Sequence, residues 1–303
     1  MSFLQLLESK PVLLLDGAMG TQLDKKDLMG VVRNNLDAPQ AVLDIHKAYA
    51  RCGCDALTTN TATMNRIYIE AHKVDVSVQK INRAGVELAD QAAACSQYVL
   101  GNMSSTGQLL EPYGAYTEAQ FHEAFREQAE ALAQAGVDGF IIETLFDLRE
   151  AACAVRACKE VSPLPTIASI AFATETKEGR TMMGDTAAQC ATQLTEAGAD
   201  VVGANCGDLD PSQMAEVVAL LKKATGRPIL AQPNAGKPQL IEGKTVFDMP
   251  PERFAEGISE CIQAGAQIVG GCCGTSPEHI QAIREMISTH RGSMSTDQHD
   301  PTS

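Results

Sequence analysis

The stretch Ala135-Gly136-Val137-Asp138-Gly139-Phe140-Ile141-Ile142-Glu143-Thr144 holds one complete transition from a helix to a strand. An amphipathic segment over 117–135 precedes it, and Gly136 stands where a left-handed helix C-cap is wanted. The apolar run 139–142 then predicts a short buried strand. Glu143 ends that strand. A carboxylate directly after an apolar run is a candidate functional group, although it could also cap the following helix.

The same pattern recurs along the chain and indicates one repeated unit. Helical segments end in Ala-Gly-Ala-Asp at 197–200 and in Ala-Gly-Ala-Gln at 264–267. Eight strands are predicted, over 11–16, 56–61, 98–103, 139–144, 165–171, 201–206, 228–233 and 267–271. Their alternation with eight helices favours a single α/β (β/α)8 TIM barrel over a doubly wound sheet. We expect the barrel over 1–288, its last helix ending at Ser288, and a disordered polar tail over 289–303.

The composition excludes several kinds of partner. The chain has 303 residues and a formal net charge of −14, which disfavours nucleic acid and anionic membranes. No apolar run of about eighteen residues and no signal peptide is found, so a cytoplasmic protein that does not enter a membrane is expected. In such a compartment the ten cysteines are expected to be free thiols or metal ligands rather than disulfides.

Two adjacent cysteines follow the last predicted strand, in Ile268-Val-Gly-Gly-Cys272-Cys273-Gly-Thr-Ser-Pro277. Neighbouring side chains on a regular strand point to opposite faces, but the flanking glycines allow both sulfur atoms to turn toward one point. That arrangement suits a metal ion. Simple packing in the core and a strained disulfide between neighbours are the alternatives.

A third cysteine ends another strand of the same predicted barrel. Cys206 closes the sixth strand, so its thiol is expected on the same rim as Cys272 and Cys273. Three thiolates suit a tetrahedral zinc ion with one open position, and none of the six histidines ends a predicted strand. We therefore predict a zinc site at the C-terminal ends of strands six and eight. Cys52 and Cys54 precede a strand, at the opposite face, and are interpreted as structural.

Three thiolates also restrict the chemistry. The resulting zinc is electron-rich and poorly suited to acidify water, but it can bind a substrate thiol as the thiolate. Alkylation of a thiol is the reaction that follows from this ligand set. The polar positions that end other strands are further candidates for the same rim, namely Asp16, Asn60, Glu143, Ser169 and Asn234. Asp16 precedes a Gly-Ala-Met-Gly turn that matches neither a dinucleotide fingerprint nor a P-loop, and it could equally serve the turn.

Taken together, these motifs resemble those of the homocysteine S-methyltransferase family over about 12–287. The resemblance is carried by Asp16-Gly-Ala-Met-Gly-Thr21, Glu143-Thr144, Asn205-Cys206, Pro233-Asn-Ala-Gly236 and Gly270-Gly-Cys-Cys-Gly-Thr275. Leu109-Leu-Glu-Pro-Tyr-Gly114 is most similar to the homocysteine-binding module of cobalamin-dependent methionine synthase. The resemblance implies zinc on the three cysteines, with the homocysteine sulfur as fourth ligand and methionine as product.

The resemblance also implies roles for the other rim residues. The amino-acid part of homocysteine would be recognised by the Ala18-Met19-Gly20 loop, Asn60, Glu143, Ser169 and Asn234. Glu143 would meet the ammonium group, and loop amides would meet the carboxylate. Asp16 and Glu143 are the candidate catalytic groups.

The methyl donor is the least constrained part of the expectation. The chain departs from relatives at Thr58, at Ala62 and over 102–105, all around the predicted barrel mouth. Small cationic donors such as S-methylmethionine or betaine need an aromatic cage, and the chain has no tryptophan. No cobalamin or folate domain is expected within the chain. A methylated corrinoid (methylcobalamin) protein is therefore the expected donor. The alternatives are an S-methylmethionine- or betaine-dependent enzyme, or a non-catalytic zinc- and thiol-binding subunit of a corrinoid complex.

Overall fold

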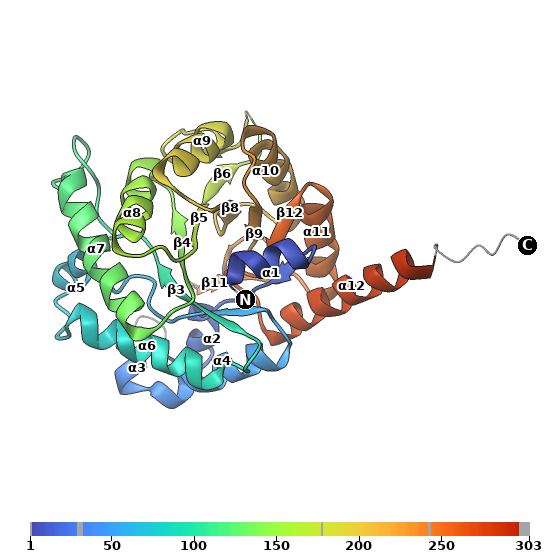
Figure 1. The fold of residues 1–303 in the computed structure, drawn as a ribbon, viewed down its shortest axis with the longest axis horizontal. Helices are drawn as coiled ribbons and strands as arrows, with labels where there is room; N and C mark the ends of the chain where they lie inside the picture. Colours follow the sequence, from blue (N-terminus) through green and yellow to red (C-terminus); the bar gives the residue numbers. More distant parts are fainter. Residues whose placement is uncertain (1, 29–32, 177, 242–243, 297–303) are drawn as a thin grey trace, which may run out of the picture.

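The computed structural model describes residues 2–28, 33–176, 178–241 and 244–296, and it contains the predicted barrel (Figure 1). Eight strands form one parallel sheet. In spatial order they are β1 (Leu13–Leu14), β12 (Ala266–Val269), β9 (Ile229–Gln232), β8 (Val201–Asn205), β5 (Thr166–Ile170), β4 (Gly139–Leu145), β3 (Tyr98–Met103) and β2 (Ala56–Thr58). A parallel bridge between Leu15 and Ala56 joins the first and last strands of this order. The predicted TIM-barrel class is thereby confirmed.

Eight helices alternate with these strands and pack around them (Figure 1). They are α4 (Pro39–Arg51), α6 (Val78–Ala92), α7 (Glu118–Ala135), α8 (Leu148–Val161), α9 (Ala187–Ala197), α10 (Pro211–Ala224), α11 (Pro251–Gln263) and α12 (Pro277–Thr296). The predicted glycine stops are present, since Gly136 and Gly198 adopt φ values of 99° and 109°. Capping boxes such as Thr117 with Gln120 begin several of the helices.

The last helix is longer than expected. It runs to Thr296 rather than ending at Ser288, so the first part of the predicted tail is helical. Figure 1 shows this end of α12 projecting from the body of the barrel. The remaining part of the predicted tail, 297–303, lies outside the described residues. Among the described residues, no helix combines the length and apolar character needed to cross a bilayer.

The half of the barrel interior nearer the amino ends of the strands is apolar. It is closed by helix α1 (Phe3–Ser9), which was not predicted. Phe3 and Leu7 of this helix pack against inward-facing strand residues in one cluster. Those strand residues are Leu13, Leu15, Ala56, Leu100, Ile141, Ile167, Val201, Leu230 and Ile268. In Figure 1 α1 lies across this end of the barrel.

The half of the interior nearer the carboxyl ends of the strands is polar. Side chains two residues apart on a strand share a face, so the positions that follow the apolar layer point inward as well. They are occupied by Thr58, Asn102, Glu143, Ser169 and Gln232, and one step higher on β8 by Asn205. The barrel therefore changes from an apolar plug to a polar chamber within one layer of side chains.

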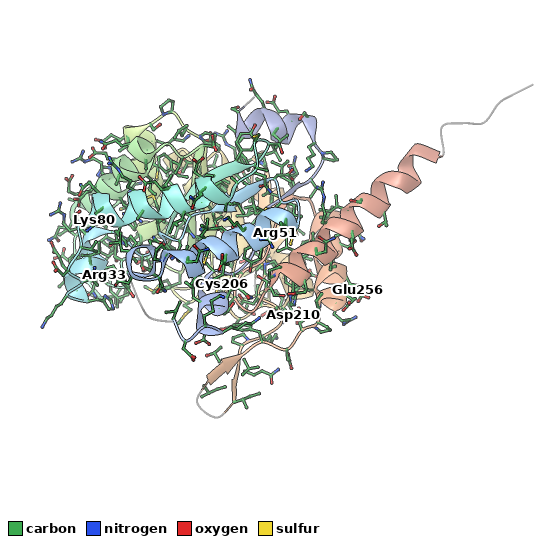
Figure 2. All side chains as sticks on the ribbon, turned by 90° about the horizontal axis from the view of Figure 1, so that it is seen from below. Arg33, Arg51, Lys80, Cys206, Asp210 and Glu256 are labelled. Carbon is green, nitrogen blue, oxygen red and sulfur yellow. The ribbon has the colours of Figure 1, made fainter. Side chains whose placement is uncertain are left out.

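Several short elements were not predicted. The helices α2 (Gly20–Asp24), α3 (Asn34–Asp37) and α5 (Arg66–Ala71) lie in the segments that follow β1 and β2. Two antiparallel hairpins occupy the loops after β5 and β9, namely β6 (Phe172–Thr174) with β7 (Arg180–Thr181), and β10 (Gln239–Ile241) with β11 (Lys244–Val246). Seen from the side in Figure 2, the β10–β11 hairpin and α1 lie at opposite ends of the molecule.

Candidate metal and substrate site

Three thiols converge where the carboxyl ends of β8 and β12 meet. The sulfur atoms of Cys206, Cys272 and Cys273 all lie within 4.8 Å of one another, and those of Cys206 and Cys273 are 3.9 Å apart. Ligands of a tetrahedral zinc ion with bonds of about 2.3 Å are about 3.8 Å apart. The spacing of these thiols therefore fits such an ion, and among the described residues they form the one cysteine, histidine or carboxylate group with metal-binding spacing.

The backbone around the thiols is held in unusual conformations. Cys206 has a φ of 55°, which is uncommon for any residue with a Cβ, and Gly207 follows with 73°. Gly274 has a φ of 81°, and a Cβ there would lie 2.3 Å from Cβ of Phe247. These turns let neighbouring sulfur atoms face one point, as the glycine-rich sequence predicted. Such strain is typical of functional sites.

The three thiols cannot all carry a negative charge without a counterion. Hydrogen bonds from the thiols of Cys272 and Cys273 lower the pKa of Cys206 to about 3. The same interactions raise the pKa of Cys272 and Cys273, since a second thiolate would face the first. A cation between them removes this conflict, because it attracts all three sulfur atoms at once. The donor set therefore fits a divalent metal.

Asn205 connects the thiols to the neighbouring strands and was given no role on the sequence alone. Its Oδ1 accepts hydrogen bonds from the Thr144 amide at 2.9 Å and the Ser169 hydroxyl at 2.8 Å. Its Nδ2 donates to the Thr144 hydroxyl at 2.7 Å and to the Cys272 sulfur at 3.7 Å. Thr144 has a φ of 61°, so this side chain also holds a strained residue in place.

A pocket of ≈ 260 Å³ opens beside the thiols. Its lining is Gly17, Ala18, Met19, Gly20, Thr21, Thr58, Thr59, Asn60, Ala62, Asn102, Glu143, Thr144, Gln232, Gly271, Cys272 and Cys273. Most of the predicted substrate-binding residues thus surround one space. Ser169 and Asn234 are buried beside it without lining it, and they bond to Asn205 and to the Gly207 carbonyl instead. Asn60 donates to Asn35 from its side-chain amide.

The two predicted catalytic carboxylates have different surroundings. Asp16 is buried and receives hydrogen bonds from the amide and the hydroxyl of Thr58, at 2.9 and 3.0 Å. It does not line the pocket, and burial raises its pKa to about 8. Glu143 does line the pocket, where Asn102 donates to its Oε1 at 2.7 Å. Burial raises the pKa of Glu143 to about 7, and the Asn102 hydrogen bond opposes that rise.

The sequence analysis considered only polar residues that end a predicted strand, and this missed part of the site. The third predicted strand ends in Met103, which is not polar and whose sulfur packs 3.5 Å from the buried thiol of Cys158 outside the barrel interior. Asn102 is the inward-facing residue. The available signal was the alternation itself, because Asn102 stands two positions after Leu100 and Gln232 two positions after Leu230.

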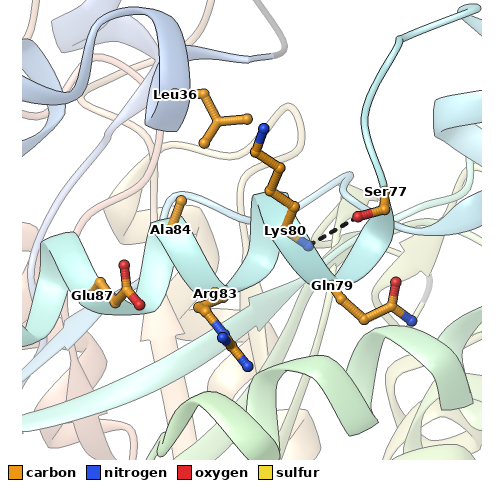
Figure 3. Close-up of a pocket in the computed structure, with 7 residues that line it drawn as sticks. All are labelled: Leu36, Ser77, Gln79, Lys80, Arg83, Ala84 and Glu87. Carbon is orange, nitrogen blue, oxygen red and sulfur yellow. Dashed lines mark hydrogen bonds between the residues drawn. The ribbon is translucent and has the colours of Figure 1, made fainter.

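A larger cavity lies on the outside of the barrel (Figure 3). It measures ≈ 460 Å³ and is lined by Leu36, Ser77, Gln79, Lys80, Arg83, Ala84 and Glu87. The hydrogen bond drawn there, from the Lys80 amide to the Ser77 hydroxyl, is the N-cap of α6. None of the candidate site residues borders this cavity. Cys52 and Cys54 are likewise remote, with thiols bonded to backbone carbonyls of Pro277 and Tyr49, in keeping with a structural role.

Comparison with known proteins places the barrel in a family. The sequence model of homocysteine S-methyltransferase matches residues 13–287. The chain belongs to the homocysteine S-methyltransferase family. This confirms the resemblance found in the sequence motifs and makes the chain a member of a methyltransferase enzyme family.

Comparisons with individual relatives agree with this family assignment. The chain is 28% identical over 301 residues to methionine synthase of Mycobacterium tuberculosis, covering 92% of this chain and 25% of that protein. It thus spans about a quarter of that relative's length. The metallated homocysteine methyltransferase MmuM of Escherichia coli superposes with a TM-score of 0.76 at 21% identity, over 93% of this chain and 98% of MmuM. Its apo form gives 0.71 at 23% identity, over 92% and 97%. These structural matches establish the fold.

The loop after β3 depends on a buried carboxylate. Glu150 on α8 accepts hydrogen bonds from the Thr106 amide at 2.7 Å, the Thr106 hydroxyl at 2.9 Å and the Ser105 hydroxyl. Burial raises the pKa of Glu150 to about 7 despite these donors. The carboxyl group is therefore neutral in the folded protein at a pH where it is ionised in the unfolded chain.

We expect this carboxyl to make stability depend on pH. A carboxyl whose pKa is raised on folding binds more protons in the native state, so the free energy of unfolding falls as pH rises from about 4.5 to about 7. Glu150→Gln keeps the acceptor oxygen without the charge. Relative to the wild type, it should gain on the order of 2 kcal/mol across this window. Urea unfolding midpoints of both proteins at several pH values measure the difference, and parallel profiles would contradict it.

Proposed function

We propose that this protein is a zinc-dependent enzyme that transfers a methyl group to the thiolate of homocysteine and forms methionine. The observation that carries the proposal is the convergence of Cys206, Cys272 and Cys273 beside a polar pocket in a barrel of the homocysteine S-methyltransferase family. When bound by these cysteines, zinc supplies a site at which a substrate thiol ionises while keeping nucleophilic character.

The pocket supports an assignment for each end of the amino acid. Glu143 offers a carboxylate to the ammonium group, and Asn102 holds that carboxylate by its 2.7 Å hydrogen bond. The Ala18 amide already donates to the Thr275 hydroxyl at 3.0 Å. The amides at the start of α2, around Met19 and Gly20, are therefore the better donors for the substrate carboxylate, since the first amides of a helix lack partners within it.

The roles of the two buried carboxylates differ in this scheme. Glu143 would contact the substrate. Asp16 would act on the substrate through Thr58, which lines the pocket and donates hydrogen bonds to the Asp16 carboxyl from its amide and its hydroxyl. Ser169 and Asn234 would act in the same indirect way, through Asn205 and through the turn at Gly207. They would position the thiols and Thr144 rather than touch the amino acid.

The surface around the pocket supports a macromolecular methyl donor. Among the described residues, no aromatic side chain lines the pocket, so an aromatic cage for a small cationic donor is not provided there. The exposed large apolar side chains of the described chain all lie on loops that follow β3, β5 and β9. They are Leu109, Tyr113, Met182, Met183, Leu240 and Ile241. We call this set the apolar rim.

The apolar rim would be more favourably buried against a protein partner than exposed to water. Tyr113, Met182 and Leu240 are 72%, 75% and 78% exposed, and all three loops lie at the carboxyl ends of the strands. Exposed apolar side chains gathered on one face mark interaction sites. We propose that a methylated corrinoid protein binds there and presents its methyl group to the pocket.

A donor panel tests the proposal. Zinc-loaded and zinc-free protein are incubated with L-homocysteine and, separately, methylcobalamin, a methylated corrinoid protein, S-methylmethionine, betaine or methyltetrahydrofolate, and methionine is measured. Turnover with the corrinoids is expected, and only with zinc. Turnover with S-methylmethionine or betaine and none with either corrinoid would refute a corrinoid as the methyl donor. No methionine above the zinc-free control with any donor would favour the non-catalytic subunit.

Leu240→Lys, on the exposed hairpin, tests the partner surface separately from the pocket. It should slow methyl transfer from the corrinoid protein by about tenfold, because a charge in the core of an interface is poorly tolerated. Transfer from free methylcobalamin should be unchanged, since that donor needs no docking surface. Equal effects on both donors would argue against a protein on the rim.

A further inference from the structure

Two buried carbonyl oxygens in the pocket have no hydrogen-bond partner. They are Oδ1 of Asn102 and Oε1 of Gln232, and neither has a partner among the described residues. The two side chains are only 7% and 3% exposed, yet both residues line the pocket beside the thiols. Buried polar atoms are nearly always paired in folded proteins, so each of these oxygens points to a ligand that satisfies it.

The orientation of Asn102 is set by its neighbour. Its Nδ2 donates to Oε1 of Glu143 at 2.7 Å, and a carboxylate can only accept, so Oδ1 must be the end left over. Gln232 stands on β9, between the strands that carry Cys206 and the Cys272–Cys273 pair. Its own backbone carbonyl accepts from the Cys206 amide at 3.1 Å, which ties its position to the thiols.

The chemistry of these groups selects one part of an amino acid. Glu143 and the two free carbonyl oxygens are all acceptors. A carboxylate would be repelled by this set, and a neutral apolar group would leave the oxygens unpaired. A primary ammonium group carries a positive charge and three donors, which match a carboxylate and two carbonyls.

We infer that Asn102 and Gln232 complete an ammonium-binding floor with Glu143, which restricts the acceptor to thiols that carry a primary amino group. The inference rests on the proposed function and assigns two further residues to recognition of the acceptor's amino group. In this arrangement the carbonyl oxygens of Asn102 and Gln232 would contact the substrate's ammonium group directly. Simple alkane thiols and thiol carboxylates leave the two oxygens unpaired and should bind poorly.

Calorimetric binding to zinc-loaded protein tests the inference without turnover. The probes are L-homocysteine, γ-mercaptobutyrate, which lacks the amino group, and homocysteamine, which lacks the carboxylate. Wild-type protein should bind homocysteine more tightly than γ-mercaptobutyrate by at least about tenfold. Homocysteamine retains the amino group, so its affinity should still include the contacts with Glu143, Asn102 and Gln232. Gln232→Leu and Asn102→Leu remove the carbonyls. Each should weaken homocysteine and homocysteamine by about tenfold or more and change γ-mercaptobutyrate by less than about twofold.

The controls separate this role from a structural one. Gln263→Leu makes the same substitution on the outer face of α11 and should leave all three affinities unchanged. Gln232→Glu keeps an acceptor and should restore amine binding, and zinc content and circular dichroism report whether each variant is folded and loaded. Equal losses of affinity for all three thiols, or no loss of affinity in either variant, would overturn the inference. The proposed methyl transfer to homocysteine would still stand. If no thiol binds the zinc-loaded wild type, both the inference and the proposed function are overturned.

Discussion

Cys206→Ala, Cys272→Ala and Cys273→Ala are each expected to lose zinc and homocysteine methylation while the barrel stays folded. Two thiolates cannot hold the ion as three do, and the three sulfur atoms lie within 4.8 Å with no further ligand group of this kind among the described residues. The affinity for zinc should fall by more than about 100-fold, since even the loss of a residue that only orients a ligand costs up to that much. Elemental analysis after dialysis measures the metal.

The fold should survive because the thiols do not belong to the core. They sit above the polar layer, whereas the barrel is stabilised by apolar layers and by α1 below. Circular dichroism and thermal unfolding of the three variants should therefore resemble the wild type. Cys95→Ala, at an exposed position outside the site, serves as the control and should keep both metal and activity. A variant that unfolds when the metal is lost would contradict this separation of site and core.

The barrel itself could be predicted because its local signals agree with its packing. Apolar runs of strand length, helical periodicity and glycine stops all repeat, and helices such as α4, α8 and α10 alternate with the strands as expected. Each of these helices buries a stripe of side chains against the sheet, and such a stripe is visible in sequence. The elements that were missed do not have this signal. The hairpins β6–β7 and β10–β11 are two or three residues a side, and β10 is exposed throughout.

The length of α12 has the same explanation. Its predicted end at Ser288 was placed where the apolar period stops, but that period reports packing rather than backbone hydrogen bonding. The helix continues to Thr296, and the hydroxyls of Ser288 and Thr289 bond back to carbonyls one turn earlier. Packing and helicity thus end at different residues in this element.

The candidate site was predicted where chemistry coincides with a strand end. Cys206, Glu143 and the Cys272–Cys273 pair meet this condition, and the structure brings them to one rim. Asn102 and Gln232 did not stand out because amides are common and both lie inside predicted strands. Their role depends on which way the side chain faces, and that direction follows from the register of the whole barrel rather than from any single strand.

Asn205→Ala is expected to reduce both stability and metal affinity. The variant leaves the Thr144 amide and the Ser169 hydroxyl without their buried acceptor and removes the support of a residue with a φ of 61°. Loss of this network should lower the free energy of unfolding by about 2–4 kcal/mol. Because Nδ2 also contacts the Cys272 sulfur, zinc affinity should fall by about 10- to 100-fold. Denaturant unfolding and competition with a chelator measure the two effects.

Asn205→Asp separates the two roles of this side chain. Aspartate keeps an acceptor for the Thr144 amide and the Ser169 hydroxyl, and its second oxygen can accept from the Thr144 hydroxyl, so most of the network survives. That second oxygen also replaces the donor that faces the Cys272 sulfur and brings a negative charge toward the thiolates. Stability should therefore recover relative to alanine, while zinc affinity stays low because the sulfur has lost its donor. If aspartate restores metal binding as well, the contact between Asn205 and Cys272 does not tune the site, and Asn205 acts through Thr144 and Ser169 alone.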